Sequence, residues 1–273
     1  MVRAVLRPAA CLALLLSAAA ACGSSRESPS RIGADAEPPD QERADSAPPE
    51  ITPTSMFVHS DTTLYVVDDQ DFDLIHIGLF GLGEEDLITD LAVTADGSVY
   101  AISSDNVFAV AADTGEATLT TEFDGGLNVG MTFLDSGELL VAEKDGTVRR
   151  VDPETGDVTP VGVFGGGYGT AGDLVAVSDG TMFAVAEDLE GEEGDSNVLV
   201  TIDPASGELD QVIGPIGFAD VFGCAYARGK VYAFTKGGDI IEVDRMTGVG
   251  TLRRSYSELT FWGAGVSPTV EVE

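Results

Sequence analysis

The chain repeats one short turn at nearly regular intervals, and this repeat constrains the fold more than any other feature. The stretches "VDPETGD" (151–157), "IDPASGE" (202–208) and "VDRMTGV" (243–249) each place a Gly four residues after an Asp, and "AADTG" ends in the same way. The closing glycines are 41, 51 and 41 residues apart, at Gly115, Gly156, Gly207 and Gly248. An acidic insertion, "EDLEGEEGDSN" at 187–197, accounts for the longer interval. The chain is therefore built from units of about 40 residues.

A second marker, a glycine-bearing hairpin, precedes each of these turns, at Gly97, Gly137, Gly180 and Gly229. Between the markers the chain runs in short apolar or alternating stretches rich in Val, Ile, Phe, Tyr and Thr, which is typical of strands. One unit reads "DLAVTAD", "SVYAIS", "NVFAVAA" and "EATLTTEF". Four strands in a unit of about 40 residues predict one blade of a β-propeller.

The recurring turn is expected between the third and fourth strands of each blade. Its Asp accepts hydrogen bonds from the turn amides, its Pro fixes φ, and its Gly takes a positive φ that strains other residues. The stretch 56–78 supplies only the later strands of a blade, while "FWGAGVS" near the C-terminus matches the first strands of the others. Joining the two ends completes a mixed blade and removes the free sheet edges. We therefore predict an all-β propeller of five four-stranded blades, with a sixth blade or a stacked solenoid as alternatives.

The N-terminal segment has the layout of an export signal. Two arginines precede an apolar run that ends in small residues before Cys22, which predicts a signal peptide over 1–21. The run "SAAAAC" resembles the lipobox of bacterial lipoproteins, which implies lipidation of Cys22 and, with Gly23 after it, sorting to the outer membrane. Residues 22–55 are rich in Ser, Pro, Ala, Asp and Glu and predict a disordered tether. The folded domain is expected at 56–273, with Cys224 as a small buried strand residue.

The charge balance is strongly acidic. The formal net charge is −33, and it becomes −35 once Arg3 and Arg7 leave with the signal. Binding to nucleic acid depends on clustered Lys and Arg, so a nucleic-acid partner is excluded, and contact with a membrane is expected only through the lipid anchor. The excess of carboxylates indicates a solvated surface, with affinity for cations or basic partners as the alternative.

The usual catalytic motifs are missing from the sequence. The "DxxTG" turn resembles the repeat of quinoprotein dehydrogenases, but the docking Trp of that family is replaced by Pro160, Gln211 and Leu252. The two histidines, His59 and His76, are expected in strands of the first blade. Without a GxSxG elbow, a CxxC pair or an HExxH helix, hydrolysis by a Ser-His-Asp triad lacks its parts.

Polar residues at the predicted starts of the innermost strands are the best site candidates. Counting back from each hairpin glycine places Asp90 and Asp173 in one column beside Phe222 and Trp262, and Asn128 and Asp220 in another. Such residues would meet across the mouth of a central channel, where carboxylate and amide oxygens suit Ca²⁺ or Mg²⁺. The alternative is that they only cap strand ends and turns. A weaker Ca²⁺ candidate is the acidic insertion, with Glu187, Asp188, Glu190, Glu192, Glu193 and Asp195, which could equally be a solvated loop.

Two resemblances frame the expected function. From Met56 to about Pro268 the chain resembles uncharacterised bacterial β-propeller lipoproteins with DPxTG-type repeats, which implies a non-catalytic binding or scaffolding module that recognises a protein or glycan of the cell envelope. The channel-mouth residues are also similar in kind to the Glu, Asn and Asp set of six-bladed lactonases. That resemblance implies, as the alternative, a divalent-metal-dependent hydrolase or lactonase, and a structural Ca²⁺ site without catalysis is the third reading.

Overall fold

The structure, a computed structural model, describes residues 51–52, 54–83, 86–192 and 195–272. The predicted signal peptide, Cys22, nearly all of the predicted tether and Glu193 lie outside these residues. The described part is built from strands and turns, and no helix in it is long and apolar enough to cross a membrane.

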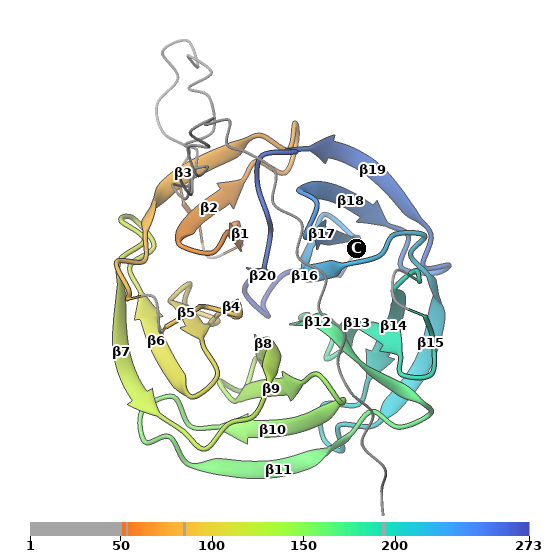
Figure 1. Cartoon of the computed structure of the whole chain (residues 1–273), viewed down its shortest axis with the longest axis horizontal. Coiled ribbons are helices and arrows are strands. Elements are labelled where there is room, and N and C mark those ends of the chain that lie inside the picture. The colour runs from red at the N-terminus through yellow and green to blue at the C-terminus, as the bar shows by residue number, and fades with distance from the viewer. Residues whose placement is uncertain (1–50, 53, 84–85, 193–194, 273) are drawn as a thin grey trace, which may run out of the picture. The chain divides into compact units, whose positions relative to one another are not determined.

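Twenty strands form five antiparallel sheets of four, arranged as the blades of a ring (Figure 1). From its innermost strand outward, blade 1 contains β20 (Gly263–Gly265), β1 (Met56–His59), β2 (Thr63–Val67) and β3 (Leu74–Leu79). In the same order, blade 2 contains β4 (Asp90–Val93), β5 (Val99–Ile102), β6 (Asn106–Val110) and β7 (Ala117–Glu122). Blade 3 contains β8 (Asn128–Phe133), β9 (Leu139–Glu143), β10 (Thr147–Val151) and β11 (Val158–Val163). Blade 4 contains β12 (Tyr168–Ala176), β13 (Met182–Asp188), β14 (Val198–Ile202) and β15 (Leu209–Pro215). Blade 5 contains β16 (Val221–Ala227), β17 (Lys230–Thr235), β18 (Asp239–Val243) and β19 (Gly250–Ser255).

The ring closes in blade 1, which combines both ends of the domain. Strand β20 pairs with β1 in antiparallel register, with Val58 opposite Ala264 and His59 opposite Gly263. The predicted five-bladed propeller with a mixed closing blade is thus confirmed, and the alternatives of a sixth blade and a solenoid are wrong. Closure leaves each blade with a neighbour on both sides, while the inner strand of each sheet remains an edge strand that faces the axis.

The repeated turn joins the third and fourth strands of its blade, as predicted. In blade 3, the Asp152 carboxylate accepts hydrogen bonds from the amides of Glu154 (2.8 Å) and Thr155 (2.9 Å). Gly156 has φ 75°, and a Cβ on it would lie 2.2 Å from the Glu122 carbonyl oxygen of the preceding blade. The repeat therefore also docks one blade on the next, because only Gly permits this approach.

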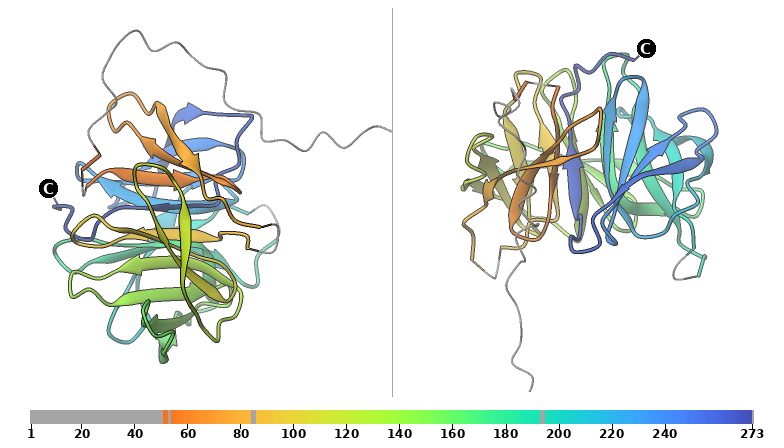
Figure 2. Two further views of the ribbon diagram at one scale, coloured as in Figure 1. Left: turned by 90° about the vertical axis from the view of Figure 1, so that its left-hand side faces the viewer. Right: turned by 90° about the horizontal axis from the view of Figure 1, so that it is seen from above.

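The two faces of the ring differ in what they carry. We call the end where the five inner strands begin the mouth face, and the opposite end, which carries the hairpins and the DxxTG turns, the turn face (Figure 2 shows the ring from the side). Strand β1 runs from Met56 at the turn face to His59 at the mouth face, where it meets the start of β20. After β20 the chain returns to the turn face, where the Val270 carbonyl accepts a hydrogen bond from the Ser178 amide. The described chain thus enters and leaves on the turn face.

Candidate functional site

One layer across the inner strands is unusual in composition. Asp90 pairs with Ile102, Gly130 with Ala142, Gly223 with Phe234 and Gly263 with His59, which are equivalent positions in four blades. Asp173 holds the same place in blade 4, directly before Leu174. We call these five residues, Asp90, Gly130, Asp173, Gly223 and Gly263, the axial layer. It contains two carboxyl groups and three positions without a side chain.

The glycines of the axial layer make room for the two aspartates. A Cβ on Gly263 would lie 2.2 Å from Asp90 Oδ1, and one on Gly130 would lie 2.5 Å from the Gly172 carbonyl oxygen. A Cβ on Gly223 would be 3.0 Å from the carbonyl carbon of Gly263. The inner strands therefore approach one another too closely for any further side chain at this level.

The two carboxyl groups accept hydrogen bonds from the amides that follow the axial layer. Asp90 Oδ2 accepts from the Met131 amide (2.6 Å) in blade 3. Asp173 Oδ1 accepts from Leu174 (2.6 Å), and its Oδ2 accepts from Cys224 (2.7 Å) in blade 5 and Ala264 (3.2 Å) in blade 1. Amides of several blades thus converge on two side chains. Buried amides need such partners, so the pair fastens the inner strands together.

Both aspartates are fully buried and hold protons unusually tightly. Burial raises the pKa of each carboxyl group well above its usual value of 3.8, and the charge of Asp173 raises the pKa of Asp90 further. The two carboxyl groups titrate as a coupled pair whose pKa values are both raised, so the pair retains a proton at a pH where an exposed aspartate has lost it. Burial and both carboxyl groups also raise the pKa of Cys224, which keeps it a thiol.

His59 borders the axial layer from strand β1. Its Nδ1 lies 2.8 Å from the Ser60 carbonyl oxygen, to which it donates, and burial lowers its pKa to about 4. Its Nε2 and Asp90 Oδ1 are buried without a hydrogen-bond partner in the described part of the chain. Both atoms flank Gly263, where an added Cβ would lie 2.7 Å from Nε2 and 2.2 Å from Oδ1.

Asn128 lies buried at the start of β8, two residues before Gly130 of the axial layer. Its Nδ2 donates to the Ser104 carbonyl oxygen (2.7 Å) and, at 3.5 Å, to that of Ser103. Within the residues that the structure describes, Asn128 Oδ1, Ser103 Oγ and Thr170 Oγ1 are buried without a partner. Asn128 thus joins the start of β8 to the β5–β6 loop of the adjacent blade.

The rim of the mouth face in blades 5 and 1 carries aromatic rings. Phe222 is the extra residue of a β-bulge between Val221 and Gly223, and Trp262 directly precedes β20. Their rings stack with centroids 5.6 Å apart and an interplanar angle of 26°. Lys236 Nζ lies 6.0 Å from each centroid. Both rings are partly exposed, whereas the residues on either side of each are buried.

The remaining residues of the predicted channel mouth take different places. Asp220 is exposed on the loop before β16, with a left-handed φ of 52°, and its carbonyl oxygen accepts a hydrogen bond from the Lys236 amide (2.8 Å). The structure thus brings Asp90 and Asp173 together at the axis, and places Asp220 and Trp262 at the rim in blades 5 and 1.

The placement of Phe222 and Trp262 in the column of Asp90 is wrong by one residue. The residues in register with Asp90 are Gly223 and Gly263. In blade 5, the hairpin turn contains only Arg228 and Gly229, whereas that of blade 2 contains residues 95–97, so counting back from the hairpin glycine goes one residue too far. Phe222 and Trp262 consequently belong to the rim and not to the axial layer.

The acidic insertion uses several of its carboxylates in local structure. Glu187 forms an ion pair with Lys144 of blade 3 (2.7 Å), Asp188 accepts from the Glu190 amide (2.9 Å), and Asp195 accepts from the Glu192 amide (2.9 Å). In the described residues, no group of three or more His, Cys, Asp or Glu side chains is placed to hold a metal ion. The insertion and the axial pair therefore provide no ready set of cation ligands there.

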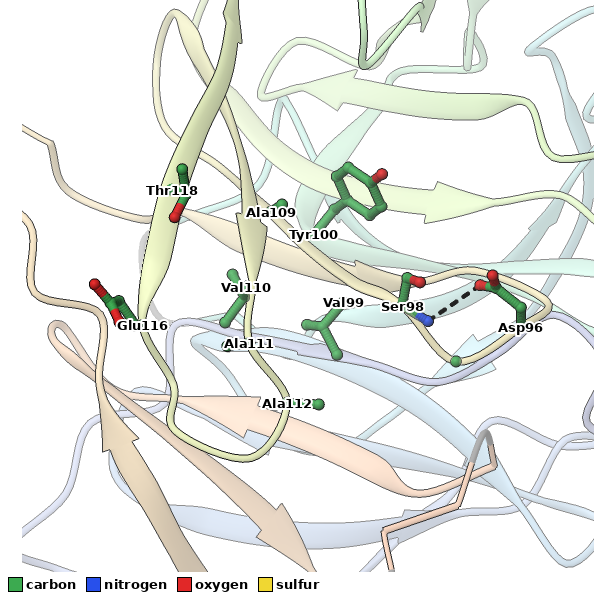
Figure 3. A pocket seen from close by; sticks show the side chains of 11 residues that line it. Asp96, Ser98, Val99, Tyr100, Ala109, Val110, Ala111, Ala112, Glu116 and Thr118 are labelled. Atoms are coloured by element: carbon green, nitrogen blue, oxygen red, sulfur yellow. Dashed lines mark hydrogen bonds between the residues drawn. The ribbon is translucent and has the colours of Figure 1, made fainter.

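Two grooves open on the outer part of the ring, and both follow the repeat. One, of about 560 Å³, is lined by the β4–β5 hairpin and by the turn between β6 and β7, including Asp96, Tyr100 and Glu116 (Figure 3). The other, of about 340 Å³, is formed by the equivalent residues of blade 3, including Glu138, Arg150 and Asp157. A groove that recurs in equivalent positions is a property of the blade and does not mark a specialised site.

Comparisons with known proteins support the fold. No protein-family model matches the sequence, and no curated protein is similar to it. Among solved structures, the chain is similar to one from a nidogen/laminin complex, with a TM-score of 0.52, 11% identity and coverage of 78% of this chain and 97% of that one. It is also similar to a symmetrical protein from a study of de novo evolutionary emergence, with a TM-score of 0.53, 14% identity and coverage of 80% and 100%. At these identities the likeness shows the β-propeller fold alone.

Sequence reasoning missed three parts of this site: His59 as a neighbour of the carboxyl pair, the layer glycines, and Lys236. The signal for His59 was its place at the end of β1, opposite the first strand of the closing blade. For Lys236 the signal was its place at the end of β17, since loops between the second and third strands lie on the mouth face.

Proposed function

We propose that this protein is a non-catalytic binding module of the cell envelope that recognises a glycan or a protein with its mouth face. The observation that carries the proposal is the contrast at this face between a sealed axis and an exposed apolar rim. The axial carboxyl groups are occupied with backbone amides, while Phe222 and Trp262 are partly exposed beside the axis. Exposed apolar clusters with a polar surround are typical of binding surfaces.

The rim continues around the mouth face in the other blades. Leu87 and Leu127 are exposed on the loops before β4 and β8, and Leu189 is exposed on the insertion of blade 4. A Cβ on Gly169 would lie 2.8 Å from Leu189 Cδ2, so this leucine lies over the start of β12. Apolar side chains thus border the mouth in blades 2, 3 and 4 as well.

The alternative function, a metal-dependent hydrolase or lactonase, has no observation in its favour. Such chemistry needs a metal ion with open positions held by several protein ligands. Asp90 and Asp173 are buried and bonded to amides, and no group of three or more acidic, Cys or His side chains among the described residues is placed to hold a metal ion.

Retention on the immobilised protein tests the proposal. Solubilised envelope polysaccharides and proteins are passed over the wild type, over Trp262→Ala at the mouth face and over Met246→Ala, an exposed control on the turn face. We expect a component that the wild type and Met246→Ala retain and that Trp262→Ala releases. Retention that Met246→Ala abolishes and Trp262→Ala does not, or no retention by the wild type, would contradict the proposal.

A further inference from the structure

We propose that Phe222, Trp262 and Lys236 form a subsite for a ring that carries a carboxylate, namely a uronic-acid residue of an acidic glycan. This inference rests on the proposed function, because it assigns a ligand chemistry to part of the mouth face. We call the three side chains the rim subsite.

The rim subsite contains two partly exposed aromatic rings. Phe222 comes from blade 5 and Trp262 from blade 1, and their rings stack between these two blades. Neighbouring residues Val221, Gly223, Phe261 and Gly263 are buried, so only the two rings project from the strands toward solvent. The faces of aromatic rings are electron-rich and attract the polarised C–H groups on the flat side of a pyranose.

Lys236 adds the charge that selects an anion. Lys144, Arg149, Arg150, Arg228, Lys230, Arg253 and Arg254 all pair with carboxylates. Arg245 bonds to the Tyr226 hydroxyl. Among the described residues, Lys236 alone of the lysines and arginines has no such side-chain partner, and its Nζ lies 6.0 Å from the centroid of each ring. In a chain of net charge −33, a free ammonium group is an exception.

The same charges argue against other ligands. A cationic ligand would meet the Lys236 ammonium at the position where aromatic faces attract cations. A polyphosphate would need several basic groups, and the rim subsite has one. A single carboxylate on a ring satisfies the lysine without demanding more positive charge.

Trp262 makes the test specific, because it is the one tryptophan of the whole chain and its fluorescence reports on the rim subsite alone. The purified protein is titrated with tri-galacturonate, with the neutral galactose trimer and with benzoate. We expect a saturable fluorescence change with tri-galacturonate at a concentration at least tenfold lower than with the neutral trimer. A fluorescence change with benzoate but not with tri-galacturonate would show that the subsite binds a ring carboxylate, and it would overturn the assignment of a glycan as the ligand.

Variants of the lysine complete the test. Lys236→Gln should weaken tri-galacturonate binding at least tenfold, and Lys236→Arg should keep most of it. Lys230→Gln on the turn face, where Lys230 pairs with Glu242 (3.6 Å), is the matched control and should bind as the wild type does. Equal responses to the charged and neutral trimers, no saturable response, or unchanged binding by Lys236→Gln would overturn the inference.

The outcome is separable from that of the proposed function. If envelope components are retained through Trp262 but no ring carboxylate changes its fluorescence, the binding function stands and the ligand assignment fails. If nothing is retained and nothing binds, both fail.

Discussion

The axial layer and the rim subsite lie next to each other, and each departs from the usual distribution of polarity. The axial layer buries polar groups, whereas the rim subsite exposes apolar ones. At the axis, two carboxyl groups are fully buried. At the rim, two aromatic rings are partly exposed beside an exposed lysine. Buried charge and exposed apolar surface are the informative exceptions in a protein. Hydrogen bonds within the protein account for the buried carboxyl groups. Nothing in the described part of the chain covers the exposed faces of the two rings. The comparison therefore separates a structural centre from a binding surface.

The largest expected effect comes from removing the carboxyl group of Asp173. Asp173→Ala leaves the buried amides of Leu174, Cys224 and Ala264 without their acceptor. We expect a loss of about 3–5 kcal/mol of unfolding free energy, because each buried unpaired donor costs about 1–3 kcal/mol. Denaturant-induced unfolding measures this loss of unfolding free energy. A loss below about 1 kcal/mol would show that the axial layer is not a structural centre.

Gly263→Ala tests whether the layer needs its glycines. The new Cβ would meet Asp90 Oδ1 and His59 Nε2, at 2.2 and 2.7 Å. Overpacking of this kind costs about 1–3 kcal/mol. Thermal and denaturant unfolding should show that loss, and an unchanged midpoint would mean that the inner strands can separate at little cost. Gly180→Ala is not a clean control because its φ is 87°, whereas Gly237→Ala has an ordinary φ and open space.

The raised pKa values of the axial pair predict a pH dependence with a definite sign. A carboxyl group whose pKa is raised on folding holds its proton more tightly in the folded state, so its contribution to stability is greatest below the unfolded value of 3.8 and is lost as pH rises through the folded pKa. Asp90→Asn mimics the protonated acid and cannot ionise. We expect the wild type to lose stability relative to Asp90→Asn as pH rises from about 4 to 8, by up to about 1.4 kcal/mol for each pH unit per proton released. Parallel unfolding curves for the two proteins would contradict the assignment.

The smallest expected effect on stability is at the rim. Lys236 is exposed and makes no ion pair in the described part, so Lys236→Gln should change the unfolding free energy by less than about 0.5 kcal/mol. The same variant should bind tri-galacturonate more weakly than the wild type does. A stability loss above about 1 kcal/mol would mean that the lysine supports the fold, which would blur the distinction between the two regions.

The sequence predicted the fold well because the repeat is local. Glycines such as Gly156 and Gly207 mark turns whose geometry depends on a few neighbouring residues, and their spacing counts the blades. Counting back from the hairpins also brought Asp90 and Asp173 into one column. That much follows from strand periodicity alone.

The rest of the site depends on contacts between blades. A sequence does not show that Gly130, Gly223 and Gly263 share a level, since each is an ordinary strand glycine in its own blade. The hairpin turn of blade 5 is one residue shorter than that of blade 2, which moved the predicted column from Gly223 to Phe222. Whether a carboxyl group meets amides or solvent is decided by neighbours that are 41 to 91 residues away in the chain.

The most direct test of the division between axis and rim compares Asp90→Asn and Lys236→Gln in the same retention experiment. We expect that Asp90→Asn retains the envelope component as the wild type does, while its unfolding changes with pH less than that of the wild type. Lys236→Gln should unfold as the wild type does but retain less. A folded Asp90→Asn protein that releases the component, together with a Lys236→Gln protein that keeps it, would place recognition at the axis and reverse the two assignments.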